Sequence, residues 1–303
     1  MQFSKRLDRF GEEIFAALNN RRMELEAQGM KIYNMSVGTP DFKTPEHIKK
    51  ALAAAAMDDN NWKYSLRDLP ELLEAVCTYY KKRFDVNLTP DMVMTVYGSQ
   101  EGMGHLGMAL CDEGDVVLLP DPCYPVFAAG SLMAGAVPYY YPLVAEHDFL
   151  PYVKDIPEEV AKKAKYMVVS LPSNPVGSIA TPGLYEEIIA FAKKYDILII
   201  HDNAYSDIIF DGAHGGSFLA TEGAKEIGVE FFQPFEILQC DRSKNQFSGW
   251  ASRCDRGTSQ AEKPDRFWNV SANSEGSDRS IEWPTGKCAG AVQNVSGKKR
   301  CTL

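Results

Sequence analysis

The sequence predicts an α/β protein with a mostly parallel sheet across residues 1–232, followed by a tail of different character. Short apolar runs alternate with stretches of helical periodicity, which is typical of parallel strands joined by helical crossovers. Polar residues follow several of these runs, at the strand ends where such sheets bind ligands. The regular pattern stops near Phe232, so we expect the tail to lie outside this fold.

Periodicity assigns the elements in chain order. Apolar residues at 7, 10, 14, 17 and 18 predict an amphipathic helix at the start, and Pro45 with the alanine-rich run 51–56 favours a helix over 45–57. Further helices are expected over 68–84, 100–110, 124–134 and 181–195, the last with Thr181 as its N-cap. Strands are expected over 92–96, 116–120, 137–143, 166–171 and 197–202.

The tail, residues 233–303, differs from the rest in composition and charge. It contains no Met and no Tyr, and its 11 basic and 8 acidic residues give a net charge of +3. Residues 1–232 hold 21 basic and 33 acidic residues, a net charge of −12. The tail is rich in Ser, Gly, Asp, Arg and Asn with little periodicity, so we expect it to be disordered.

The composition argues against several classes of function. A net charge of −9 argues against a nucleic acid partner, because phosphate binding requires a basic face. No apolar run approaches the roughly 20 residues of a membrane span, and the N-terminus has no signal-peptide core, so we expect a cytoplasmic protein. The seven cysteines form no Cys-x-x-Cys pair, so we expect no metal site.

Two turns after predicted strands carry side chains that suit an anionic and a planar ligand. YGSQEG (97–102) opens a helix, where backbone N–H groups and the side chains of Ser99 and Gln100 can hold a phosphate. In DPCYP (121–125), Tyr124 can lie flat against a planar ring. Taken singly, an ordinary capped turn and a core tyrosine explain the same residues.

Two later turns place an amide and an acid in similar positions. Asn174 lies in the Pro-fixed turn SNPVG (173–177) and can hydrogen-bond a ligand hydroxyl, although a plain Asn-Pro turn explains it as well. Asp202 begins DNAY (202–205) at the end of an apolar strand, where a buried carboxylate needs a cationic partner such as a protonated ring nitrogen. Tyr205 can reach the same ligand. The alternative for Asp202 is a solvated loop acid.

Together and in this order, GTPDF, YGSQEG, DPCYP, SNPVG and DNAY resemble the pyridoxal-phosphate-dependent aminotransferases of class I/II, fold type I, from about residue 5 to 232. The sequence is most similar to the branch that contains LL-diaminopimelate, alanine and aspartate aminotransferases. The resemblance implies a three-layer α/β/α large domain over 46–232, incomplete at its end, preceded by an N-terminal arm and small-domain part over 1–45. Residues 233–303 would be foreign to the family.

The resemblance also implies roles for single residues around pyridoxal 5'-phosphate. The implied contacts are Ser99 and Gln100 to the phosphate, Tyr124 on the ring face, Asn174 and Tyr205 to the ring hydroxyl, and Asp202 to the protonated ring nitrogen. Gly38 would lie against the substrate carboxylate, and Tyr64 would reach the phosphate of a neighbouring subunit, which implies a homodimer. The substrates would be an amino acid and a 2-oxo acid.

The lysine that family chemistry requires is missing. Members hold the cofactor as a Schiff base on a lysine in a Ser-x-Ser-Lys stretch after Asp-x-x-Tyr, followed by a phosphate-binding arginine, and no such stretch occurs here. Residues 233–245 can be encoded so that reading one base later gives Ser-Leu-Ser-Lys-Ser-Phe-Asn-Val-Thr-Gly-Ala-Arg-Ile. We therefore hypothesise a frameshift that puts Glu236 at the position of the lysine and Lys244 at that of the arginine.

The chain as written is expected to lack aminotransferase activity and to keep weak cofactor binding. Lys244, which follows a serine in RSKN, is a rival candidate for the Schiff-base lysine. Two other functions stay open. One is a β-lyase of the same fold that acts on cysteine-type substrates, and the other is a non-catalytic pseudoenzyme or binding protein.

Overall fold

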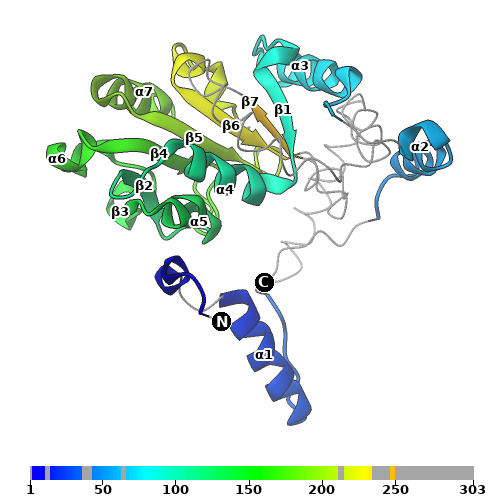
Figure 1. Cartoon of the computed structure of the whole chain (residues 1–303), viewed down its shortest axis with the longest axis horizontal. Coiled ribbons are helices and arrows are strands. Elements are labelled where there is room, and N and C mark those ends of the chain that lie inside the picture. Colours follow the sequence, from blue (N-terminus) through cyan, green and yellow to red (C-terminus); the bar gives the residue numbers. More distant parts are fainter. Residues whose placement is uncertain are drawn as a thin grey trace.

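The computed structural model describes residues 2–10, 14–35, 43–62, 66–210, 215–233 and 246–249. Within them the chain forms a seven-stranded sheet in the order β1-β7-β6-β5-β4-β2-β3 (Figure 1). The strands are β1 (Val93–Val96), β2 (Val116–Asp121), β3 (Val137–Pro142), β4 (Ala164–Ser170), β5 (Leu198–Asn203), β6 (Gly228–Phe232) and β7 (Gln246–Gly249). Strands β2 to β6 pair in parallel, and β7 runs antiparallel between β1 and β6, so β7 alone opposes the others.

Helices α4 to α7 lie between successive strands, and α1 to α3 precede the first strand. The α-helices are α1 (Ile14–Ala27), α2 (Glu46–Ala56), α3 (Pro70–Phe84), α4 (Gly98–Leu110), α5 (Val126–Ala134), α6 (Glu158–Ala161) and α7 (Leu184–Tyr195). Short 3₁₀ helices lie at Lys5–Arg9, Asp59–Trp62, Pro90–Met92, Ala145–His147, Val153–Asp155, Phe218–Ala220 and Ala224–Glu226. Helix α3 illustrates how the sequence favours a helix at both of its ends. It begins with Pro70, whose missing N–H costs nothing in a first turn, and three basic residues in its last turn face the negative end of the helix dipole.

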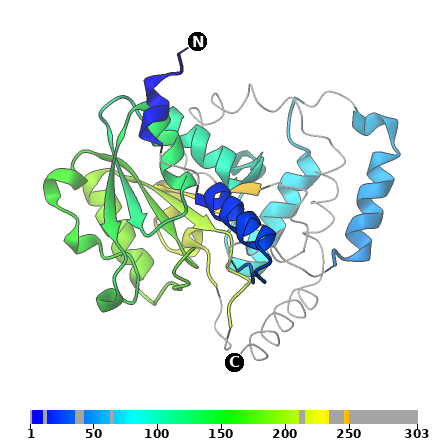
Figure 2. The ribbon, with the colours of Figure 1, turned by 90° about the horizontal axis from the view of Figure 1, so that it is seen from below.

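The sheet is covered on both faces. Helices α4 and α5 lie on one face and α3 and α7 on the other, as Figure 1 shows, while α2 stands apart in both views (Figures 1 and 2). Side chains of β4 alternate between the two cores: Val168 joins the cluster beneath α4, and Val169 joins the cluster beneath α3. This confirms the three-layer α/β/α fold with a mostly parallel sheet. The proposed boundaries at 45 and 232 remain predictions.

The structure differs from the sequence prediction at two helix starts. The N-terminal segment is split between the 3₁₀ helix Lys5–Arg9 and α1, and Leu7 and Leu18 are each 48% exposed, so their apolar spacing does not mark a core-facing helix. Thr181 is not the N-cap of α7. The cap is Gly183, in the left-handed conformation, and the Thr181 carbonyl accepts the N–H of Leu184 in the preceding turn.

Two strands escaped the sequence prediction. Strand β6, GVEFF, carries Glu230 at its centre, and an acid in the middle of a strand interrupts the apolar run that marks a buried strand. Strand β7 lies in the tail, where the sequence analysis expected no strand, and the expected disorder of the tail stays a prediction. Backbone pairing on both sides holds β7 between β1 and β6, and such pairing needs no particular side-chain pattern.

Glycines set how closely α4 and α5 approach each other. A Cβ added at Gly130 would lie 2.2 Å from the carbonyl oxygen of Gly104, and one at Gly107 would lie 2.7 Å from the Gly130 backbone. Neither position accepts a side chain unless a helix moves, because packed interiors leave no such space. Helix α4 opens with the YGSQEG turn and α5 follows the DPCYP turn, so this contact also sets the spacing between those turns.

Replacing Gly130 by alanine should destabilise the fold, whereas the same change at Gly104 should not. A Cβ at Gly104 meets no atom within 4 Å. We expect G130A to lower the free energy of unfolding by roughly 1–3 kcal/mol, because the helices must separate. G104A should leave it unchanged or raise it by up to about 1 kcal/mol, since alanine favours helix over glycine. Urea unfolding followed by circular dichroism measures both, and equal stabilities would contradict this account.

Candidate active site

The turns singled out in the sequence lie at one edge of the sheet. Strands β1, β2, β4 and β5 run in the same direction, so their carboxyl ends share that edge. The residues there are Ser99 and Gln100 after β1, Tyr124 after β2, Asn174 after β4, Asp202 within the end of β5, and Tyr205 just beyond it. This is the edge at which ligands bind in sheets of this kind.

Asp202 lies on the face of the sheet that α4 and α5 cover. It pairs in register with Phe231 of β6, which belongs to the core cluster beneath α4. A Cβ added at Gly102 would lie 2.3 Å from the Phe231 ring, so the first turn of α4 presses onto β6 beside the end of β5. The YGSQEG turn follows the edge strand β1, and the packing of α4 on β6 brings this turn toward Asp202.

Asp202 is a buried residue whose carboxyl lacks a hydrogen-bond partner among the described residues. The residue is 7% exposed, and in the described part of the chain its side chain makes no hydrogen bond. Burial raises the pKa of Asp202 to about 6, and the neighbouring His201 opposes that shift only in part. The hydroxyl of Ser170, its register partner on β4, is also buried and unpaired there. Unpaired polar groups are costly to bury, so this place suits a ligand with a positive charge or an N–H donor.

Gln100 and Tyr124 join the first two turns directly. The Gln100 Nε2 donates to the Tyr124 hydroxyl at 2.5 Å. The Tyr124 ring packs edge-on against Phe127, with ring centroids 6.0 Å apart, and Phe15 of α1 lies 6.4 Å away at a tilted angle. Tyr124 is only partly buried, so the sheet edge presents an aromatic ring whose orientation neighbouring side chains hold.

The first turn of α4 has the character of an anion site. Its N-cap residue, Tyr97, supplies no side-chain cap, and the N–H of Tyr97 itself donates to the Glu101 carboxylate. The N–H groups of a first helical turn have no partner within the helix, and they point toward the positive end of the helix dipole. Ser99, which is partly exposed, adds a hydroxyl beside them.

For two of the remaining predicted residues the structure gives the backbone turn and the extent of burial. Asn174 is partly buried in a turn that the Gly177 N–H closes by donating to the Ser173 carbonyl at 2.8 Å. Tyr205 is partly buried, and its carbonyl accepts the N–H of Ile208 at 2.9 Å. Four others lie outside the described residues: Gly38, Tyr64, Glu236 and Lys244.

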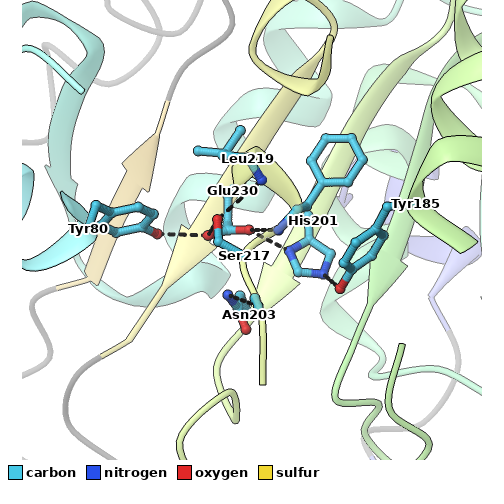
Figure 3. A network of polar contacts seen from close by, with 9 residues as sticks. Tyr80, Tyr185, His201, Asn203, Ser217, Leu219 and Glu230 are labelled. Carbon is cyan, nitrogen blue, oxygen red and sulfur yellow. Dashed lines mark hydrogen bonds and ion pairs between the residues drawn. The ribbon is translucent and has the colours of Figure 1, made fainter. Parts of the chain in front are cut away.

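The opposite face of β5 carries a buried polar network that the sequence analysis missed (Figure 3). At its centre, Glu230 of β6 is 0% exposed and accepts the Tyr80 hydroxyl at 2.9 Å, the Ser217 hydroxyl at 2.8 Å and the Phe218 N–H at 2.8 Å. His201 Nδ1 lies 2.9 Å from its second oxygen. The signal that could have revealed this network is the acid within GVEFF, because a buried acid requires donors.

The donors decide the charge state of Glu230. Burial works to raise the pKa of Glu230, but the bonds from His201, Ser217 and Tyr80 outweigh burial and lower it. The other ring nitrogen of His201, Nε2, lies 3.0 Å from the Tyr185 hydroxyl of α7, so the imidazole is held from both sides. The Glu230 carboxylate and both ring nitrogens of His201 thus have partners on this face of β5, in contrast to the Asp202 carboxyl on the other.

Within the described ranges, no group of three or more His, Cys, Asp and Glu side chains is arranged to hold a metal ion. No helix in those ranges combines the length and the apolar character needed to cross a membrane.

Comparison with known proteins shows which proteins this chain resembles. The sequence profile of aminotransferase class I and II matches residues 30–229. An LL-diaminopimelate aminotransferase of Dehalococcoides mccartyi is 41% identical over 233 residues, which are 76% of this chain and 60% of that protein. The chain therefore spans about three fifths of the length of this curated relative.

Solved structures agree with the sequence match. BacF from Bacillus subtilis superposes with a TM-score of 0.91 at 28% identity, covering 97% of this chain and 75% of that chain. A probable N-succinyldiaminopimelate aminotransferase from Thermus thermophilus gives a TM-score of 0.87 at 29% identity, covering 92% of this chain and 76% of that chain.

The stability of the chain should depend on the charge of Asp202. Its pKa rises from the usual 3.8 to about 6 on folding, so the folded state holds the proton more tightly and stability falls as pH rises between those values. Asp202→Asn cannot ionise. We expect it to gain stability over the parent across this range, by roughly 3 kcal/mol at most. Urea unfolding between about pH 4 and pH 7, with the exposed Asp112→Asn as control, measures the gain. A difference that does not change with pH would contradict the prediction.

Proposed function

Because the chain belongs to the aminotransferase class I and II family, we propose that it is the cofactor-binding part of an enzyme that moves an amino group from an amino acid to a 2-oxo acid. Members of this family depend on pyridoxal 5'-phosphate. The observation that carries the proposal is the buried, unpaired carboxyl of Asp202 at the end of β5.

The described residues fit this cofactor. A buried carboxylate at Asp202 can hold a proton on a pyridine ring nitrogen, and the charged ring in turn removes the cost of burying the acid. The first turn of α4, with Ser99 and Gln100, suits the phosphate, and Tyr124, oriented by Gln100, suits the ring face. When bound, pyridoxal 5'-phosphate supplies a ring that accepts electrons from the substrate carbon.

The other assigned roles are part of the proposal. Asn174 and Tyr205 would donate to and orient the ring hydroxyl from the turns after β4 and β5. Gly38 would contact the substrate carboxylate. Tyr64 would reach the phosphate of a neighbouring subunit, so we propose a homodimer. LL-diaminopimelate is the amino acid to test first, because the relative that bears this substrate in its name is 41% identical to the chain.

The position of the cofactor-binding lysine remains the main departure from the family. Glu236 would place a negative charge where a lysine is expected, so we propose that the chain as written does not catalyse amino transfer. The frameshift hypothesis accounts for this substitution, and the profile match that ends at residue 229 is consistent with it. Sequencing the gene tests the hypothesis, since codons at 233–245 that forbid the shifted reading would end it.

A non-catalytic pseudoenzyme is the second candidate, and the lack of a Ser-x-Ser-Lys stretch in residues 1–303 favours it. A β-lyase would use the same cofactor site. Assays of a frame-restored protein with LL-diaminopimelate and with cysteine-type substrates would separate the β-lyase from the aminotransferase.

The chain should bind pyridoxal 5'-phosphate without a covalent link and without turnover. We expect a saturable absorbance change on titration, with affinity reduced about tenfold or more in Asp202→Asn, because one buried charge pair is lost. The exposed Asp112→Asn serves as the matched control.

Borohydride reduction followed by mass spectrometry checks for a lysine adduct. A lysine-linked product together with turnover would overturn the proposed inactivity and would point to Lys244. Equal affinity of the parent and Asp202→Asn would instead overturn the role of Asp202.

A further inference from the structure

The segment from Asp202 to Tyr205 is bracketed by two acid-centred contacts with one helix, α3. On its N-terminal side lies the Glu230 network of Figure 3, which His201 joins immediately before Asp202. On its C-terminal side lies a second contact, centred on Asp207, two residues beyond Tyr205. The proposed ligand residues thus lie between two anchored points of the backbone.

The second contact occupies both oxygens of Asp207. Arg83 Nε donates to Oδ1 at 2.8 Å, and Nη2 lies 2.8 Å from the same oxygen. The Tyr79 hydroxyl donates to Oδ2 at 2.8 Å. The side chains of Arg83 and Asp207 are 25% and 10% exposed, so water screens the pair little. Hydrogen bonds between charged groups are shorter and stronger than neutral ones, so Asp207 is firmly held to α3.

The first contact is equally saturated. Tyr80, the residue next to Tyr79 in α3, donates to Glu230 at 2.9 Å. Glu230 faces four donors in all, including the His201 ring. Any displacement would leave a buried donor or acceptor unpaired, which is costly. His201, and with it the backbone of Asp202, is therefore held from the same helix.

We propose that Tyr79, Tyr80 and Arg83 of α3 are positioning residues for Asp202 and Tyr205. Core packing alone would not require the hydrogen bonds to Asp207 and Glu230. Because Tyr79 and Tyr80 are adjacent and reach an acid on either side of the segment 202–205, we call these contacts the clamp. The inference rests on the proposed function, because the placement of Asp202 and Tyr205 matters only if a ligand uses them. These residues act through Glu230 and Asp207 and need not touch the ligand.

Replacing Arg83 by alanine tests the clamp, with Lys81→Ala as the control. Lys81 pairs with Asp85 on the exposed side of α3, so its removal takes a cation from the same helix and leaves the clamp intact. Without added ligand, we expect R83A to speed amide hydrogen exchange over residues 203–210 by about tenfold and to leave β2 and β4 unchanged. K81A should match the parent.

Two milder variants guard against a loss of folding. Arg83→Lys keeps the charge but not the planar fork, so its exchange should lie between that of the parent and that of R83A. Tyr80→Phe removes one of four donors to Glu230, so we expect a smaller increase, on β5. Exchange that rises evenly over all strands in R83A, or that does not rise at 203–210, would overturn the positioning role.

A titration with pyridoxal 5'-phosphate links the clamp to the site. Its affinity should fall about tenfold in R83A and stay unchanged in K81A. Local loosening in R83A with an unchanged affinity would also overturn the proposal. If the parent binds no pyridoxal 5'-phosphate, the proposed function fails by itself, and the local exchange over 203–210 still decides whether α3 holds the segment.

Discussion

Strand β5 is buried on both faces, and the chemistry assigned to this chain depends on that burial. Little water reaches either side, so a polar group on the strand is costly to bury unless it finds a partner in the protein or in a ligand. His201 faces α3 and α7, where the protein supplies every partner of the network around Glu230. Asp202, one residue later, faces α4 and α5, where the described chain supplies none. The two-sided burial thus separates a structural face from the face that we propose binds the cofactor.

Two acids on adjacent strands show how similar burial gives opposite results. Burial raises the pKa of Asp202 because no donor offsets the lost hydration. Glu230 is buried at least as deeply, yet its hydrogen bonds lower its pKa. A carboxylate with every lone pair engaged fixes the strands around it. A buried carboxylate without a donor lowers the stability of the fold, and for the same reason it favours the binding of a positively charged ring.

The sequence predicted the parts of the fold that local patterns specify. Strands β2, β4 and β5 each contain a short apolar run, and Asp202 was located at a strand end from the chain alone. The network could not be foreseen, because Tyr80 and Glu230 are 150 residues apart and the acid hides the strand that carries it. The contact between Gln100 and Tyr124 likewise depends on how closely α4 and α5 approach, which glycines at their crossing permit. The residue types therefore indicated that a ligand binds, but only the structure shows which residues of distant elements are in contact.

Strand β7 has a consequence for how the protein is made. Among the described strands, β1 pairs only with β7, whereas β2 to β6 pair with one another. β1 leaves the ribosome early, but its hydrogen-bonding partner emerges some 150 residues later, after the whole family-matched region has been synthesised. The central strands can therefore pair with one another before β1 gains its hydrogen-bonding partner. Among the described strands, β7 is therefore the last to be synthesised, and the sheet can reach β1 only after that point.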